Sequence, residues 1–193
     1  MSLIPAFEIG LWNAWIFMLV DALTLPFFLR IVRNRQSPSP EKAMGGMSRV
    51  EKTILYGSKA MYIPALIYSI FLPLKLGTRW FYIGLPITLI GLITGVMVLV
   101  NWATTPPDEP VTRGLYRYSR HPMYVAAFLM YVGLGIACAS WVFLLFAVVI
   151  TVVSFVYADA EEKLTLEMYG DSYREYINRT SRYIGLPRSG KVN

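Results

Sequence analysis

Residues 121–158 form a run of 38 residues without a single Asp, Glu, Lys or Arg. A helix needs about 20 mostly apolar residues to cross a bilayer, because the hydrocarbon core is about 30 Å thick and each residue rises about 1.5 Å. The run is therefore about twice as long as one crossing requires. It predicts two membrane helices, over residues 121–139 and 140–158, joined by a tight turn near Cys138–Trp141.

Three further apolar segments precede this pair of helices. Residues 9–29 contain one charge, Asp21, and residues 81–101 contain none. The segment 54–75 has a shorter uninterrupted apolar stretch, but the stems of lysines at its ends can reach the membrane interface. The sequence thus predicts an all-α integral membrane bundle of about five transmembrane helices, forming a single domain over residues 1–193. A cytoplasmic amphipathic tail is expected over residues 159–185.

Glycines in the third segment indicate close helix packing. Gly91 and Gly95 form a small-xxx-small pair, which lets two helix backbones approach each other. We interpret this pair as a packing groove.

The charge of the chain follows this topology. Charged residues make up 16% of the chain and hydrophobic residues 55%, whereas a soluble domain has roughly 25% charged residues. Sixteen of the 18 Lys and Arg residues fall in segments 30–59, 113–120 and 163–191, which share one side in a five-span chain. The positive-inside rule places that side in the cytoplasm and the N-terminus outside. The net charge of +6 is then a topology signal, and no nucleic-acid partner is expected. A turn at Gln36–Pro40 is predicted in the first cytoplasmic loop.

Metal and disulfide chemistry have little support in the sequence. The chain has one cysteine, Cys138, and one histidine, His121. A single cysteine excludes an intrachain disulfide, and these counts exclude a multi-cysteine or histidine metal cluster.

Two polar segments lie where the predicted hairpin begins and ends. One is Gly114–Tyr124 (GLYRYSRHPMY) and the other begins at Asp159 with the pair Glu161 and Glu162. Because the hairpin makes them neighbours, Arg120, His121 and the helix start at Pro122 can hold an anion while the glutamates accept hydrogen bonds. A zwitterionic nucleoside ligand fits this combination.

Structural explanations for the same residues remain open. His121 can be a helix-end residue, and the two glutamates can be solvated charges at a membrane boundary. Asp21 is either a functional intramembrane acid or a hydrogen-bonded structural one. In the tail, one helical face carries Glu162, Leu166, Tyr169, Tyr173 and Tyr176. Tyr173 and Tyr176 can also be interfacial anchors.

The combined pattern resembles the isoprenylcysteine carboxyl methyltransferase family and its phospholipid methyltransferase relatives. The matching elements are Gly114-Leu115-Tyr116, Arg120-His121-Pro122-Met123-Tyr124, the hydrophobic hairpin, Glu161-Glu162 and the tail Tyr169-Gly170 to Tyr176. The order and spacing match over roughly the last 80 residues. The loop of residues 102–112 is short and rich in proline, and it departs from the family pattern on the side that helps to form the acceptor site.

The resemblance implies an integral membrane methyltransferase that uses S-adenosylmethionine and takes a lipophilic acceptor from the bilayer. The acceptor would be a prenylcysteine-type carboxylate, a phospholipid amine or a thiol. Cofactor binding is expected from Tyr116, His121, Pro122, Tyr124, Glu161 and Glu162, and catalysis from Arg120, Glu162 and Arg182. No metal is implied, and the sequence leaves the oligomeric state open.

Two other functions compete with methyl transfer. Membrane sterol reductases share a related C-terminal cofactor region and use NADPH, but this chain is short for that group and lacks a clear basic patch for a 2′-phosphate. A small transporter would use polar residues along several spans. The three C-terminal spans offer almost none at mid-depth.

Overall fold

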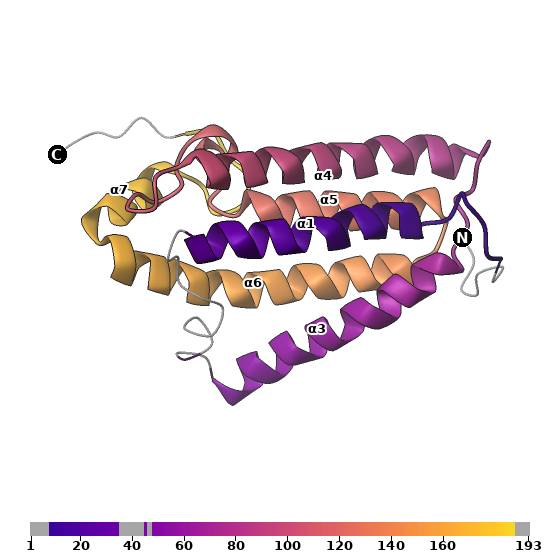
Figure 1. The fold of residues 1–193 in the computed structure, drawn as a ribbon, viewed down its shortest axis with the longest axis horizontal. Helices are drawn as coiled ribbons and strands as arrows, with labels where there is room; N and C mark the ends of the chain where they lie inside the picture. The colour runs from indigo at the N-terminus through magenta and orange to yellow at the C-terminus, as the bar shows by residue number, and fades with distance from the viewer. Residues whose placement is uncertain (1–7, 35–44, 46–47, 188–193) are drawn as a thin grey trace.

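The computed structural model describes residues 8–34, 45 and 48–187, and the regular elements within these ranges are helices joined by loops (Figure 1). The helices are α1 (Trp15–Asn34), α3 (Arg49–Ile70), α4 (Arg79–Thr104), the 3-10 helix η1 (Gly114–Arg117), α5 (Pro122–Ala137), α6 (Trp141–Tyr169) and α7 (Asp171–Arg179). The described ranges contain no strand, which confirms the all-α prediction for them. The predicted turn at Gln36–Pro40 lies outside the described residues.

Two helices of the described part, α4 and α6, are long and apolar enough to cross a membrane. Helix α5 has 16 residues and is shorter than this requirement. Helix α6 has 29 residues and is about 44 Å long at the usual rise, which exceeds a hydrocarbon core of about 30 Å. Its last turns, from Asp159 onward, are therefore expected to project beyond the membrane. The five-span arrangement stays a prediction.

The helices α1, α4, α5 and α6 run along the long axis of the molecule, and α3 diverges from them (Figure 1). The turn between α5 and α6 occupies Cys138–Ser140. Ala139 takes a positive φ of 51° there, and the Ser140 hydroxyl caps α6 by accepting from Phe143 N at 3.2 Å. This turn makes α5 and α6 antiparallel neighbours, so the start of α5 faces the end of α6.

Glycines allow the backbones of α4 and α5 to touch. A Cβ atom at Gly84 would lie 2.2 Å from the nitrogen of Ala137, and one at Gly91 would lie 2.4 Å from the nitrogen of Met130. A Cβ atom at Gly133 of α5 would lie 2.4 Å from the nitrogen of Thr88. These distances leave no room for a side chain, so the three glycines set the separation of the two helices.

Only Gly91 of the predicted Gly91–Gly95 pair takes part in this close backbone contact. A Cβ atom at Gly95 would meet its nearest neighbour, the Cβ of Ala126, at an ordinary 4.0 Å. The contact face of α4 instead carries the buried residues Gly84, Thr88 and Gly91. Their spacing of four and three residues keeps them on one side of the helix.

Asp21 joins three helices within the bundle. Its Oδ2 atom accepts hydrogen bonds from the hydroxyls of Tyr62 in α3, at 3.0 Å, and Tyr131 in α5, at 2.7 Å. A polar group in an apolar interior needs such partners. The contacts match the structural alternative that the sequence left open for Asp21.

The glycine contacts predict opposite effects for two substitutions on one helix. We expect Gly91→Ala to lower the free energy of unfolding by about 1–3 kcal/mol, because its methyl group would press on the backbone of α5. Gly95→Ala should be neutral or slightly stabilising, since alanine favours helix by up to about 1 kcal/mol over glycine. Thermal unfolding of both variants in detergent measures the difference. Equal melting temperatures would contradict a backbone contact at Gly91.

Candidate functional site

The site is built on a pairing between the residues before α5 and a C-terminal strap, which we define as residues 180–186. The nitrogen of Arg120 donates to Ser181 O at 3.0 Å, and the nitrogen of His121 donates to Arg182 O at 3.2 Å. Gly185 N donates to Tyr118 O at 3.0 Å. These bonds hold the strap across the start of α5, next to the end of α6.

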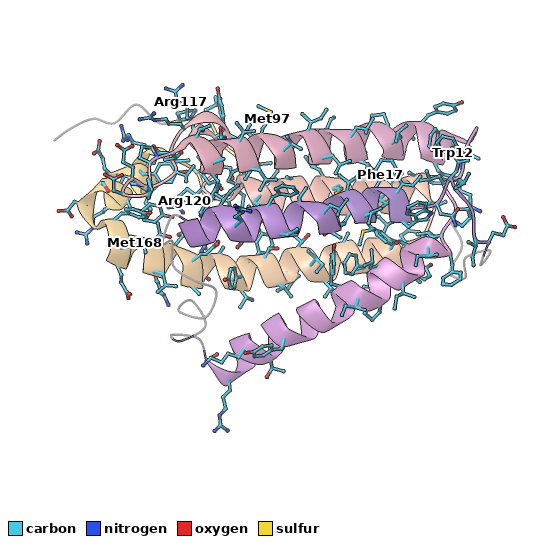
Figure 2. All side chains as sticks on the ribbon, viewed as in Figure 1. Trp12, Phe17, Met97, Arg117, Arg120 and Met168 are labelled. Carbon is cyan, nitrogen blue, oxygen red and sulfur yellow. The ribbon has the colours of Figure 1, made fainter. Side chains whose placement is uncertain are left out.

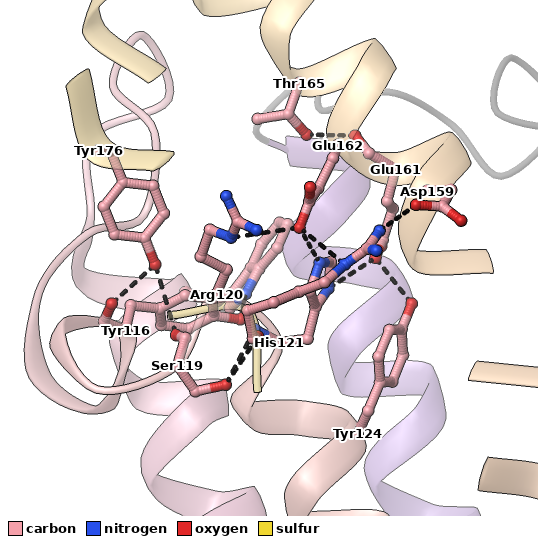
Figure 3. A network of polar contacts seen from close by, with 12 residues as sticks. Tyr116, Ser119, Arg120, His121, Tyr124, Asp159, Glu161, Glu162, Thr165 and Tyr176 are labelled. Carbon is pink, nitrogen blue, oxygen red and sulfur yellow. Dashed lines mark hydrogen bonds and ion pairs between the residues drawn. The ribbon is translucent and has the colours of Figure 1, made fainter. Parts of the chain in front are cut away.

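Glu162 of α6 is the centre of the polar network (Figure 3). Its Oε1 atom lies 2.8 Å from His121 Nε2, 3.3 Å from Arg120 Nε and 3.4 Å from Arg182 Nε. The Glu162 side chain is 16% exposed and that of Arg120 is 12% exposed. Three groups from two distant parts of the chain thus converge on one carboxylate oxygen.

Glu161 contacts the other side of the same histidine. Its Oε2 atom accepts a 2.7 Å hydrogen bond from the Tyr124 hydroxyl and lies 3.6 Å from His121 Nδ1. The rings of His121 and Tyr124 are stacked, with centroids 5.2 Å apart and planes within 3°. His121 therefore lies between two carboxylates, an arrangement that suits an imidazolium with both nitrogens protonated.

The environment shifts the pKa values of this pair in opposite directions. Burial alone would lower the pKa of His121, but its hydrogen bond to Glu162 and the nearby carboxylate of Glu161 raise it above 6.5. Burial alone would raise the pKa of Glu162, but the hydrogen bond to His121 and the charges of Arg120, His121 and Arg182 bring it below 4.5. Both shifts favour the ionised pair.

Arg182 extends the network to a third carboxylate. Its Nη2 atom pairs with Asp159 Oδ1, and Asp159 lies one turn before Glu162 on α6. The sequence-based prediction placed Asp159 at the start of the second polar segment but gave it no role, although its i,i+3 spacing from Glu162 places both on one helix face. It also missed Tyr183, whose ring packs edge-on against Phe155 with centroids 4.7 Å apart. No sequence signal points to Tyr183.

Tyrosines of η1 and α7 support the turn that carries this network. Tyr176 donates from its hydroxyl to Tyr116 O at 2.7 Å, and Tyr116 accepts at its own hydroxyl from the indole nitrogen of Trp102. Tyr173 and Tyr176 are buried, so their interpretation as interfacial anchors is wrong. Helix α6 also ends at Gly170, which has a φ of 55°, and the predicted continuous face is split between two helices.

The structure brings most of the predicted site residues together. Arg120, His121, Tyr124, Glu161, Glu162 and Arg182 share one network, with Arg120 at the same end of the molecule as Arg117 and Met168 (Figures 2 and 3). Pro122 is buried at the first position of α5. Tyr116 lies in η1, where its contacts support the turn that carries Arg120 and His121.

The donor set fits a zwitterionic ligand. The Nε atoms of Arg120 and Arg182 are buried and make no hydrogen bond, although they lie 3.3 and 3.4 Å from Glu162 Oε1. The two guanidinium groups are charged donors suited to a carboxylate. Asp159, Glu161 and Glu162 supply anionic acceptors for hydroxyl, amino or cationic groups. No group of three or more His, Cys, Asp or Glu side chains suited to a metal ion occurs among the described residues.

Comparisons with known proteins show what this region is similar to. Residues 81–172, just under half of the chain, match the phospholipid methyltransferase family model. A stretch of 91 residues is 36% identical to a protein named methanethiol S-methyltransferase 1 from Bradyrhizobium diazoefficiens. That stretch covers 47% of this chain and 31% of the relative, so the chain spans about a third of the relative's length. The family resemblance of the sequence is confirmed.

The paired pKa shifts predict how the His121–Glu162 contact depends on pH. The raised pKa of His121 gives stability that is complete below 6.5 and is lost as pH rises through the folded-state value. The lowered pKa of Glu162 gives stability that is present above 4.5 and is lost as pH falls through its folded-state value. The contact should therefore stabilise the fold most between pH 4.5 and 6.5.

Melting temperatures of the wild type and His121→Gln, measured from pH 4 to 9, test this prediction. The loss caused by His121→Gln should correspond to roughly 1.5–3 kcal/mol near pH 6, the range for hydrogen bonds to charged groups, and should shrink toward pH 9. Arg179→Gln, which removes an exposed pair with Glu175, serves as the control and should change little. A destabilisation by His121→Gln that grows with pH would refute the charged pair.

Proposed function

Because residues 81–172 match the phospholipid methyltransferase family, we propose that this membrane protein transfers a methyl group from S-adenosylmethionine to an acceptor that partitions into the bilayer. The observation that carries the proposal is the convergence of Arg120, His121 and Arg182 on Glu162. It offers anionic and cationic groups within one cluster at the end of two apolar helices. A zwitterionic, hydroxyl-bearing cofactor needs both.

The roles of the residues follow from their chemistry. Glu161 and Glu162 would accept hydrogen bonds from the amino and hydroxyl groups of the cofactor, with His121 and Tyr124 fixing the two carboxylates. Arg120 would hold an anionic group of the cofactor or acceptor through its guanidinium, which also contacts Glu162. Tyr116 and Pro122 shape the turn beneath them.

The bound cofactor would supply an electrophilic methyl group on a sulfonium. The work left to the protein is to align the acceptor in line with that methyl group and to exclude water. A carboxylate acceptor needs no base. An amine or thiol acceptor releases a proton, and Glu161 or Glu162 would take it.

The name of the similar protein, methanethiol S-methyltransferase 1, supports a thiol among the acceptors to be tested. We also propose the five-span topology, with the N-terminus outside and the site in the cytoplasm, because 16 of the 18 Lys and Arg residues then lie on the cytoplasmic side. On that side the Glu162 cluster would meet a soluble cofactor.

Two substitutions at the centre of the cluster test the cofactor site. Glu162→Gln and His121→Ala should each lower the affinity for S-adenosylhomocysteine about tenfold or more, because a hydrogen bond to a charged group is worth about 1.5–3 kcal/mol. Isothermal titration in detergent measures the affinities. Glu167→Gln, on an exposed position of the same helix, and Asp21→Asn should leave the affinity unchanged. Wild-type affinity in both cluster variants would exclude this site.

The reductase alternative predicts a different ligand. Thermal shift with S-adenosylhomocysteine should raise the melting temperature, whereas NADPH should not. Stabilisation by NADPH and not by S-adenosylhomocysteine would identify the protein as a reductase and exclude the methyltransferase proposal. A radiolabelled methyl-transfer assay against membrane lipid fractions, prenylated cysteines and small thiols then identifies the acceptor.

A further inference from the structure

The guanidinium of Arg182 occupies a site with the features of an organic-cation binding site. Its Nη2 atom pairs with Asp159, its Nε atom lies 3.4 Å from Glu162 Oε1, and its central carbon lies 5.8 Å from the centre of the Tyr183 ring. Both carboxylates are on α6 and carry contacts in Figure 3. Carboxylates beside an aromatic face are what proteins use to bind quaternary ammonium and related cations.

Arg182 is the more easily displaced of the two arginines. Its side chain is 31% exposed and its partner Asp159 is 59% exposed, whereas Arg120 is 12% exposed. An ion pair as exposed as that between Arg182 and Asp159 is weak, because solvent screens it, so another cation can compete with Arg182 for this carboxylate.

The backbone of the strap can stay in place while the side chain of Arg182 changes partner. The carbonyl of Arg182 accepts from the nitrogens of Arg120 and His121, both at 3.2 Å, and from the Ser119 hydroxyl at 3.3 Å. The neighbouring Tyr183 ring packs against Phe155. The exchange of cations therefore requires only the rotation of one long side chain.

We propose that Arg182 is a resident cation that competes with the positive charge of the methyl donor for Asp159 and Glu162, and so lets the site discriminate between charged donor and neutral product. This inference rests on the proposed methyl transfer. In that reaction an acceptor lone pair forms the new bond to the methyl carbon, and the electrons of the broken C–S bond pass to sulfur. The sulfur changes from a cationic sulfonium to an uncharged thioether.

The loss of charge on sulfur determines when the Arg182 side chain pairs with the two carboxylates. Before transfer, the two carboxylates have a second cation available and Arg182 can leave them. After transfer they need a counter-ion again, and Arg182 returns to Asp159 and Glu162. Re-pairing then weakens the hold of the site on the product.

Binding of two ligands that differ in this charge tests the inference without turnover. Sinefungin carries a protonated amine near the sulfonium position, and S-adenosylhomocysteine carries a neutral sulfur there. In Arg182→Gln the ratio of affinities should shift roughly three- to fivefold toward sinefungin, because the competing cation is gone. Arg182→Lys keeps the charge and should keep the ratio near the wild-type value. Arg179→Gln, at an exposed position of α7, controls for general loss of positive charge.

A second variant keeps the test decisive if Arg182→Gln does not fold. Asp159→Asn removes one carboxylate of the site and should shift the ratio in the opposite direction, toward S-adenosylhomocysteine. An unchanged ratio in the variant that folds, with both ligands still bound, would overturn the role of Arg182 and leave methyl transfer standing. Failure of the wild type to bind either ligand would overturn the proposed function itself.

Discussion

The half-buried carboxylate of Glu162 is the interaction on which the arrangement of this end of the molecule depends. A carboxylate with a 16% exposed side chain is costly to ionise unless cations and hydrogen-bond donors surround it. Arg120 and His121 reach it from the start of α5, and Arg182 reaches it from the strap. The need to neutralise one charge therefore explains why segments about 60 residues apart in the chain meet at α6.

The helix frame places this charge near the end of the long apolar helix α6. Contact between the backbones of α4 and α5 at Gly84, Gly91 and Gly133 fixes where α5 begins. The short turn from α5 to α6 then brings the end of α6 back beside that start. Because α6 is longer than the hydrocarbon core, the polar network can lie outside the membrane while the apolar turns remain within it. The outer face of α4 keeps large exposed hydrophobic side chains, such as Ile90 and Ile93, for lipid.

This position suits a reaction that joins a water-soluble donor to an acceptor in the bilayer. The same few side chains would serve the donor before transfer and its uncharged product afterwards, since only the charge on sulfur changes. Arg182 is well placed for both states because its backbone is hydrogen-bonded to the start of α5 while its side chain is 31% exposed. The Asp21 cluster lies apart from this chemistry, on the face where α1, α3 and α5 join.

The sequence by itself determined the helical class and the two segments that form the site. Hydrophobic runs and missing charges reveal membrane helices, because the requirement for about 20 apolar residues is local in the chain. The short hairpin was enough to predict that Arg120 and His121 meet Glu162. Only the tertiary structure decided that Asp159 and Tyr183 join Arg182, that Tyr176 is buried, and that Gly91 contacts α5 while Gly95 does not. Such contacts depend on how helices rotate and how far long side chains reach, and no periodicity along a single helix records them.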